Sequence, residues 1–139
     1  MIYIAADHAG FELKEEIKKY LIEQNKEFED LGAFELDKDD DYPDFIAPVA
    51  KKVAENPGQN RGIVFGGSGQ GEAIVSNRFK GVRAAVYYGG NPGIVKLSRQ
   101  HNDANVLSLG ARFLTKEQAL EAVELWLSAS FEGGRHARR

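Results

Sequence analysis

The chain of 139 residues contains no cysteine, and it has only four prolines, three histidines and one tryptophan. Without cysteine it can form no disulfide framework, no thiolate nucleophile and no cysteine-ligated metal or iron–sulfur centre. No apolar run approaches the roughly 20 residues that span a bilayer, so we expect no membrane partner. The segment after Met1 lacks the basic start and cleavage site of a secretory signal, which favours a cytoplasmic protein.

Charge is unevenly distributed along the chain, although the net charge is only −3. Residues 1–60 carry 15 acidic and 7 basic side chains, whereas residues 61–139 carry 6 and 11, including all eight arginines. The acidic run 37–41 is interpreted as a solvated loop. An acidic chain lacks the broad basic face that duplex binding needs, so we expect no nucleic-acid partner. Clustered arginines suit a small anionic ligand, although solvated helix faces remain the alternative for any single one.

Strand-like and helix-like segments alternate along the chain. Short apolar runs predict five strands, at 2–5, 26–31, 62–65, 83–88 and 105–109. Apolar spacing and turn residues predict helices at 11–24, 43–55, from about 72 to 79, from 92 to about 100, and from 116 to about 128. This alternation predicts a single α/β domain over 1–139, a three-layer α/β/α sandwich around a five-stranded parallel sheet, Rossmann- or flavodoxin-like.

Some helix boundaries have specific signals. Thr115 and Gln118 have the spacing of a capping box. Asn91 is expected to cap a helix that has Pro92 at its first position. Pro48 is expected to kink the second helix or to delay its start, because proline lacks the N–H that the helix needs.

In a parallel α/β sheet, ligands bind beyond the carboxyl ends of the strands. The segments expected there are 6–8, 66–72, 88–91 and 110–112. We therefore expect one site that these four segments build together.

The segment 66–72 is a glycine loop between a strand and a helix, with glycines at positions 66, 67, 69 and 71. Backbone N–H groups in such a loop can converge on an anion. The P-loop requires lysine after its second glycine, and the dinucleotide fingerprint requires a small residue where Glu72 stands. The nucleophile elbow requires glycine where Gln70 stands. All three motifs fail, and a tight turn without a ligand remains the alternative.

The loop also carries a hydroxyl, Ser68, and a carboxylate, Glu72. Burial beside a substrate would raise the pKa of Glu72 towards that of a useful general base. The loop amides would then stabilise a developing enolate oxygen. The alternative for Glu72 is an ordinary acidic residue in the first turn of a helix.

The histidines and arginines supply further candidates. His8 follows Asp7 at a strand end, and both His8 and His101 are expected at the carboxyl edge of the sheet. No HExxH or paired-histidine spacing occurs, so we expect no metal and acid–base chemistry without one. Arg112 and the arginines of a basic C-terminal arm, 131–139, are candidates for binding a phosphate group. A frayed terminus is the alternative for His136 and Arg138.

Six segments together resemble the type B ribose-5-phosphate isomerases, a family that includes galactose-6-phosphate isomerase subunits. They are AADHAGFELK (5–14), DYPDF (41–45), GGSGQGEAIVSNR (66–78), GVRAA (81–85), SRQHNDANVLSLGAR (98–112) and FEGGRHARR (131–139). The resemblance implies isomerisation of D-ribose 5-phosphate and D-ribulose 5-phosphate through a cis-enediolate, without metal or cofactor. It also implies a homodimer or dimer of dimers with sites at the subunit interface.

The resemblance also implies roles for individual residues. Glu72 is the base, Ser68 moves a proton between the substrate oxygens, and His101 opens the sugar ring, with Asp7 assisting. The enediolate is bound by the loop 67–71, with Gly67, Gly69 and Gly71, and by Asn102. The phosphate is bound by His8, Arg112, Arg135 and Arg139, some of them from the neighbouring subunit.

One position departs from many members of the family. They have a cysteine base at the first position of the glycine loop, where this chain has Gly66. The sequence GGSGQGE resembles a smaller branch that uses a glutamate, which implies Glu72. Two other functions remain open: isomerisation of a hexose 6-phosphate such as allose or galactose 6-phosphate, and a flavodoxin-like module that binds FMN or a nucleotide.

Overall fold

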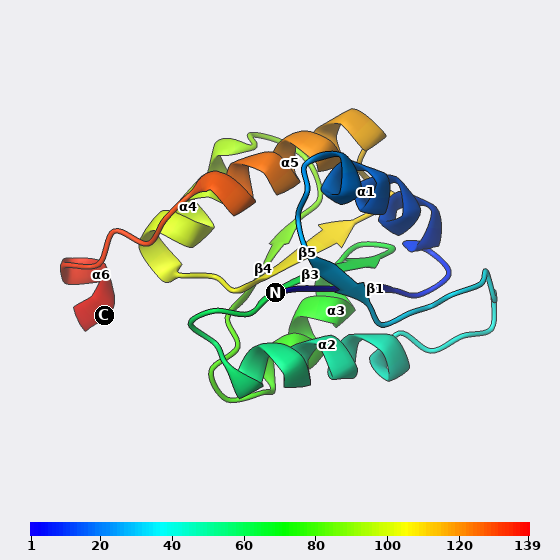
Figure 1. Ribbon diagram of the computed structural model, residues 1–139, viewed down its shortest axis with the longest axis horizontal. Coiled ribbons are helices and arrows are strands. Elements are labelled where there is room, and N and C mark those ends of the chain that lie inside the picture. The colour runs from blue at the N-terminus through cyan, green and yellow to red at the C-terminus, as the bar shows by residue number, and fades with distance from the viewer.

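The computed structural model describes residues 1–139, and it places helices on both faces of one five-stranded sheet (Figure 1). The strands are β1 (Ile2–Ala6), β2 (Phe28–Asp30), β3 (Arg61–Gly66), β4 (Ala84–Tyr87) and β5 (Val106–Gly110). The helices are α1 (Phe11–Glu23), α2 (Pro43–Glu55), α3 (Gln70–Asn77), α4 (Gly93–Asn102), α5 (Lys116–Ser128) and α6 (Arg135–Arg138). The predicted α/β/α fold is confirmed. No helix has the length and apolar character to cross a membrane.

The strands lie in the order β2-β1-β3-β5-β4, and every neighbouring pair is parallel. The flavodoxin order is 2-1-3-4-5, so the last two strands are exchanged here. Burial agrees with this order. Every residue of β5 is buried, whereas only one of the four residues of β4 is, as expected for an inner strand and an edge strand.

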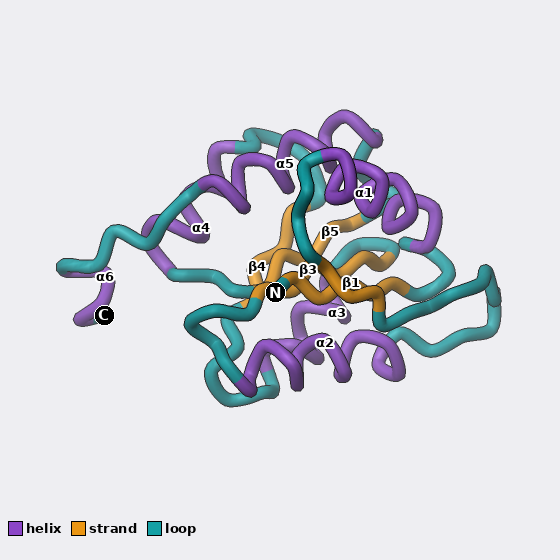
Figure 2. The backbone as a smooth tube through the Cα atoms, viewed as in Figure 1, coloured by secondary structure: helices purple, strands orange, loops and turns teal.

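Successive side chains of each strand point to opposite faces, which divides the core in two. Ile63 and Phe65 pack on the face covered by α1, α4 and α5, with Trp126 of α5. Val64, between them in sequence, packs on the opposite face with Val49 of α2. Figure 2 shows the three helices above the sheet and α2 with α3 below it. The two faces therefore have separate apolar clusters held apart by one layer of strands.

The element boundaries confirm some of the local predictions and correct others. The capping box is confirmed, because the Thr115 hydroxyl accepts from Gln118 N at 3.1 Å and the Gln118 side chain accepts from Thr115 N at 2.8 Å. Pro48 does not delay α2, which begins at Pro43 and runs through Pro48. Pro92 is the residue before α4 rather than its first residue.

The C-terminal arm leaves the body of the protein after α5 and ends in the short helix α6, well away from the sheet (Figure 1). Its main attachment is to the end of α4, where Glu132 N donates a hydrogen bond to Gln100 O at 3.0 Å. The position of the arm determines where its arginines can act.

Candidate active site

A pocket of about 300 Å³ lies at the carboxyl ends of β1 and β3. We call it the carboxyl-edge pocket. The connection after β1 leads to β2 on one side of this point, and the connection after β3 leads to β4 on the other side. The sheet therefore forms a crevice between β1 and β3, of the kind in which α/β proteins bind ligands. The lining residues come from four segments: Asp7, His8, Ala9, Tyr42, Gly67, Ser68, Gly71, Glu72 and Arg112.

Glu72 is the buried acid of this pocket. It lies in the first turn of α3, only 4% of its surface is exposed, and no basic side chain forms an ion pair with it. Burial raises the pKa of Glu72, and the nearby charge of Asp7 raises it further. A carboxylate that is hard to keep ionised is a better proton acceptor, which suits a general base.

The loop makes room for this carboxyl group at Gly66. A Cβ atom on residue 66 would overlap the carboxyl group of Glu72. Glycine is also required at Gly69, which precedes α3 with a φ of +80° and whose carbonyl accepts from the Ser108 hydroxyl at 2.7 Å. Gly66 and Gly69 therefore help to position the carboxyl group of Glu72 as well as the backbone amides of the loop.

Asp7 and His8 are fixed at the turn after β1. Asp7 Oδ1 accepts hydrogen bonds from Ala9 N at 3.0 Å and from Gly10 N at 3.2 Å. His8 Nδ1 lies 2.7 Å from Asp40 Oδ1, which also accepts from His8 N at 3.1 Å. The hydrogen bond to Asp40 raises the pKa of His8. Since Nδ1 is occupied, Nε2 is the ring nitrogen left for a ligand.

Two residues of this region were not predicted as site residues. Asp40 belongs to the acidic run that we interpreted as a solvated loop, yet its side chain is only 6% exposed and its Oδ2 has no hydrogen-bond partner. Tyr42 was given no role beyond its place in the segment DYPDF (41–45), before the predicted helix 43–55, yet its ring lies over Gly71, where a Cβ would come within 2.7 Å of it. The loop 31–42 brings both residues to the pocket, and no spacing in the sequence indicates this.

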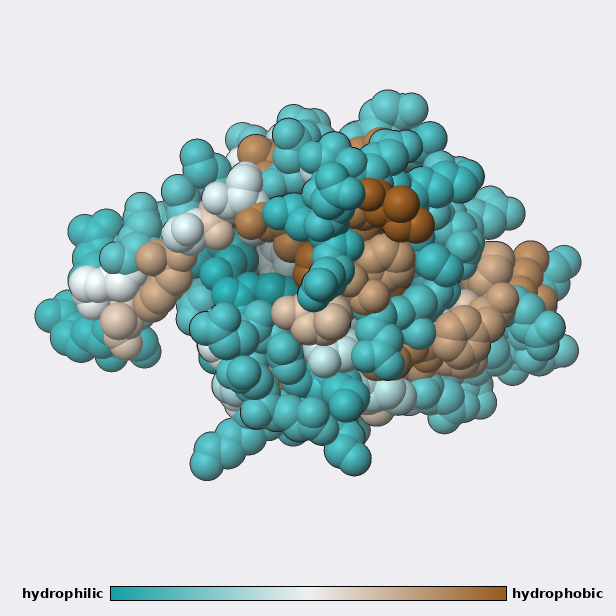
Figure 3. Space-filling view, viewed as in Figure 1, coloured by the Kyte–Doolittle hydropathy of each residue, from teal (hydrophilic) through white to brown (hydrophobic).

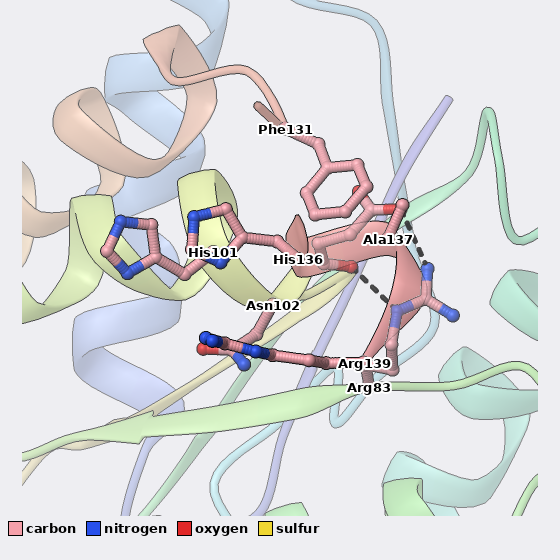
Figure 4. A pocket seen from close by; sticks show the side chains of 8 residues that line it. Arg83, His101, Asn102, Phe131, His136, Ala137 and Arg139 are labelled. Carbon is pink, nitrogen blue, oxygen red and sulfur yellow. Dashed lines mark hydrogen bonds and ion pairs between the residues drawn. The ribbon is translucent and has the colours of Figure 1, made fainter. Parts of the chain in front are cut away.

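His101 and Asn102 lie in a different pocket, of about 700 Å³, which we call the amino-edge pocket (Figure 4). Its other lining residues are Arg83, Asp103, Phe131, His136, Ala137 and Arg139. The prediction that His101 lies at the carboxyl edge of the sheet is therefore wrong, because in its own chain His101 lies at the opposite, amino edge. A crossover helix runs antiparallel to the strands that it joins, so the last residues of α4 lie at the amino edge, where β5 begins.

Most of the predicted site residues thus line one of the two pockets, and two of them line neither. The carboxyl-edge pocket holds Asp7, His8, Gly67, Ser68, Gly71, Glu72 and Arg112. The amino-edge pocket holds His101, Asn102 and Arg139. Gly69 precedes α3 beside the first pocket, and Arg135 begins α6 without lining either pocket. The predicted segment 88–91 does not line the carboxyl-edge pocket.

The sheet and the carboxyl-edge pocket define a class of protein. A buried acid with a raised pKa lies at the switch point of a parallel sheet, beside a glycine loop. A histidine with a raised pKa and an arginine, Arg112, line the same pocket. This is an α/β protein with an acid–base site for a small anionic ligand.

Comparisons with known proteins give the family. The family model described as Ribose/Galactose Isomerase matches residues 2–139. The probable ribose-5-phosphate isomerase B of Mycoplasma pneumoniae is 44% identical over 138 residues, which cover 99% of this chain and 89% of that protein. For ribose-5-phosphate isomerase B of Escherichia coli (strain K12) these values are 42%, 99% and 90%. The crystal structure of ribose-5-phosphate isomerase B from Mycoplasma genitalium with bound ribulose-5-phosphate matches with a TM-score of 0.95 and 43% identity, covering 99% of this chain and 90% of that one. The chain belongs to the ribose/galactose isomerase family.

Proposed function

We propose that this chain interconverts D-ribose 5-phosphate and D-ribulose 5-phosphate, with Glu72 as the base. The observation that carries the proposal is the buried carboxyl group of Glu72, held against Gly66 in a pocket with Arg112. The relatives named ribose-5-phosphate isomerase B support the substrate. We also expect a cytoplasmic location, where sugar phosphates are metabolised.

The proton transfer needs only one base. Glu72 removes the proton from the carbon next to the substrate carbonyl, which leaves a cis-enediolate, and returns it to the neighbouring carbon. Ser68 in the same pocket moves a proton between the two substrate oxygens. The amides of 67–71 stabilise the negative oxygen of the intermediate. No metal or cofactor enters this proposal.

The phosphate group is assigned to the cationic side chains. His8 carries its proton more readily because Asp40 accepts from Nδ1, so Nε2–H can donate to a phosphate oxygen. Arg112 lies across the glycine loop, with its Nη1 3.3 Å from where a Cβ on Gly67 would be. Both groups belong to the carboxyl-edge pocket.

Ring opening requires a second subunit in this proposal. His101, Asn102 and Arg139 line the amino-edge pocket of the same chain, away from Glu72. We therefore propose a homodimer, alone or paired into a dimer of dimers, in which the amino-edge pocket of one subunit covers the carboxyl-edge pocket of the other. Exposed apolar side chains on α3, on α4 and just after β4 and β5 support an interface: Ile74, Tyr88, Ile94, Leu97 and Phe113. The face seen in Figure 3 is largely hydrophilic, with brown patches beside α1 and at the loop after β2, where Phe34 is 74% exposed.

Mixed dimers test the shared site directly. Glu72→Gln and His101→Asn chains are co-expressed, and each is also prepared alone. Random pairing makes half of the dimers mixed, and each mixed dimer has one intact shared site, so activity returns to about a quarter of the wild-type value. The control pairs Glu72→Gln with Asp7→Asn, two changes in the same pocket, and recovers nothing. Recovery in the control, or none in the test, contradicts the shared site.

The substrate is tested by isomerase assays on ribose 5-phosphate and on allose and galactose 6-phosphates, all with EDTA present. We expect the highest kcat/KM with the pentose. A higher value with either hexose phosphate assigns the chain to the hexose reaction, and loss of activity in EDTA contradicts the metal-independent mechanism.

A further inference from the structure

Three potential metal ligands meet at the end of α4, although they are distant in sequence. His101 and His136 stack with their ring centroids 4.3 Å apart and their planes 11° apart. Glu132 Oε1 lies 3.5 Å from His101 Nε2 and 3.7 Å from His136 Nε2. The ligand atoms of all three residues lie within 4.8 Å of one another.

These distances are close to those of a zinc site. In a tetrahedral site with bonds of about 2.0–2.1 Å, neighbouring ligand atoms are separated by about 3.3–3.4 Å. The two distances to the carboxylate are thus only slightly longer than a bound ion requires. Two histidines and one glutamate also form a known zinc ligand set, with the fourth position open to water or another ligand. Imidazole ligands favour zinc and similar ions over magnesium or calcium.

The backbone already holds Glu132 and His136 of the C-terminal arm near His101. Glu132 and His136 are four residues apart on the C-terminal arm, and Glu132 N is hydrogen-bonded to Gln100 O beside His101. The near-parallel rings do not direct both lone pairs at one point, so one ring must turn when an ion binds. His101, whose side chain is 40% exposed, has the space to turn, whereas His136 is 12% exposed.

The surroundings also set a limit on affinity. Arg139 and Arg83 line the same pocket, and their charges oppose a cation. The charge of Arg83 is partly offset, because it forms an ion pair with Asp103 at 3.2 Å. The cluster is therefore suited to reversible binding rather than to a permanently bound ion.

We propose that His101, Glu132 and His136 form a binding site for a divalent transition-metal ion such as zinc, and that this ion inhibits the enzyme. The inhibition rests on the proposed function, in which His101 opens the sugar ring. A metal ion on Nε2 occupies the lone pair with which His101 exchanges a proton. The same protein is then independent of metal for catalysis and sensitive to zinc as an inhibitor.

The test begins with metal binding to the full-length, EDTA-treated protein. Calorimetry measures the binding of zinc, added as zinc chloride, and the visible spectrum monitors the binding of cobalt. We expect one ion per chain and a cobalt spectrum typical of tetrahedral coordination. Glu132→Gln and His136→Gln should each weaken zinc binding at least about tenfold, as expected for the loss of one of three ligands. Glu117→Gln, a change on the exposed first turn of α5, should leave it unchanged.

Activity on ribose 5-phosphate is then measured with and without zinc. The rate of each protein in EDTA is its own reference, and relative to that reference Glu132→Gln and His136→Gln should require at least about tenfold more zinc for half-inhibition than the wild type does. Wild-type zinc affinity in both variants overturns the site. Zinc that binds there without changing activity supports the site and contradicts the ring-opening role of His101, so the two proposals fail separately.

Discussion

The two pockets of this chain are built in different ways. In the carboxyl-edge pocket, Glu72 is almost fully buried and Asp7 is fixed by two backbone N–H groups. In the amino-edge pocket, the side chain of His101 is 40% exposed, the neighbouring Glu132 is 48% exposed, and part of the wall is a terminal arm. Burial makes a carboxylate basic, whereas groups that contact the substrate from a second subunit must remain accessible before assembly. In the dimer that we propose, the carboxyl-edge pocket is preformed in one chain and the amino-edge pocket is completed by association.

The largest effect is expected from the preformed pocket. Glu72→Gln keeps the shape of the side chain and removes the base, so kcat should fall about 10²–10⁴-fold. Steady-state kinetics on ribose 5-phosphate measure this, and KM should change little. In the wild type, the raised pKa of Glu72 should place the acid limb of the pH–kcat/KM profile above the usual range of a glutamate. A near-normal kcat in Glu72→Gln rules out this base.

Gly66→Ala tests how tightly the carboxyl group is held. A Cβ on residue 66 must displace Glu72, so we expect a loss of kcat of about 10–10³-fold, since small misplacements of a reacting group are costly. The double variant Gly66→Ala/Glu72→Ala should be no slower than Glu72→Ala, because the three atoms nearest to the added methyl all belong to the Glu72 carboxyl group, which is then absent. Additive losses would show that Gly66 acts independently of Glu72.

For the amino-edge pocket, a chain ending at Ser130 lacks the arm with Arg135 and Arg139. If these arginines bind the substrate phosphate of the neighbouring subunit, KM should rise about 10–100-fold, because a charge-assisted hydrogen bond contributes about 1.5–3 kcal/mol. Thermal unfolding should remain close to that of the full chain, since no residue of the arm is buried. Arg138→Ala, which removes a charge of the same arm that has no assigned role in substrate binding, is the control. An unchanged KM in the shortened chain would remove the arm from the site.

A smaller effect is expected at the rim of the preformed pocket. Asp40→Asn removes the charged acceptor of His8, so the pKa of His8 should fall and KM should rise about 2–10-fold at pH 7–8. The NMR titration of the His8 ring measures the pKa directly. Asp39→Asn changes an exposed residue in the same loop and should alter neither quantity. If His8 titrates at the same pH in Asp40→Asn, the contact does not control its charge.

The smallest expected effect concerns stability. The pKa of Glu72 is raised in the folded state, so the folded protein binds this proton more tightly than the unfolded chain does. Stability from this group is present at low pH and is lost as the pH rises through the folded pKa. Glu72→Gln should therefore raise the Tm by a few degrees at pH 8 and leave it unchanged near pH 4. Calorimetric scans at the two pH values give the comparison, and an equal shift at both would exclude titration as the cause.

The sequence predicted the elements well because their signals are local. Apolar runs identified β3 and β5, and Thr115 with Gln118 identified the start of α5. The strand order depends on which helices pack together, and no short segment carries that information. This is why the exchange of β4 and β5 was not predicted.

The site was predicted in part for the same reason. Glu72 and the glycine loop lie in one continuous segment, so their proximity follows from the chain itself. Asp40 reaches His8 from a loop 32 residues away, and His101 meets His136 only through the path of the C-terminal arm. Such contacts are set by tertiary packing, and the residue types alone do not reveal them.

The space shared by Gly66 and Glu72 constrains how this pocket can change over generations. The family resemblance implies two alternative bases, a cysteine at the first loop position or a glutamate further along. Because a side chain at position 66 displaces the carboxyl group of Glu72, one pocket cannot hold both bases at once. A lineage that moves from one base to the other must pass through a chain with a damaged site or change both positions together. The two solutions should therefore mark separate branches of the family rather than alternate freely within one.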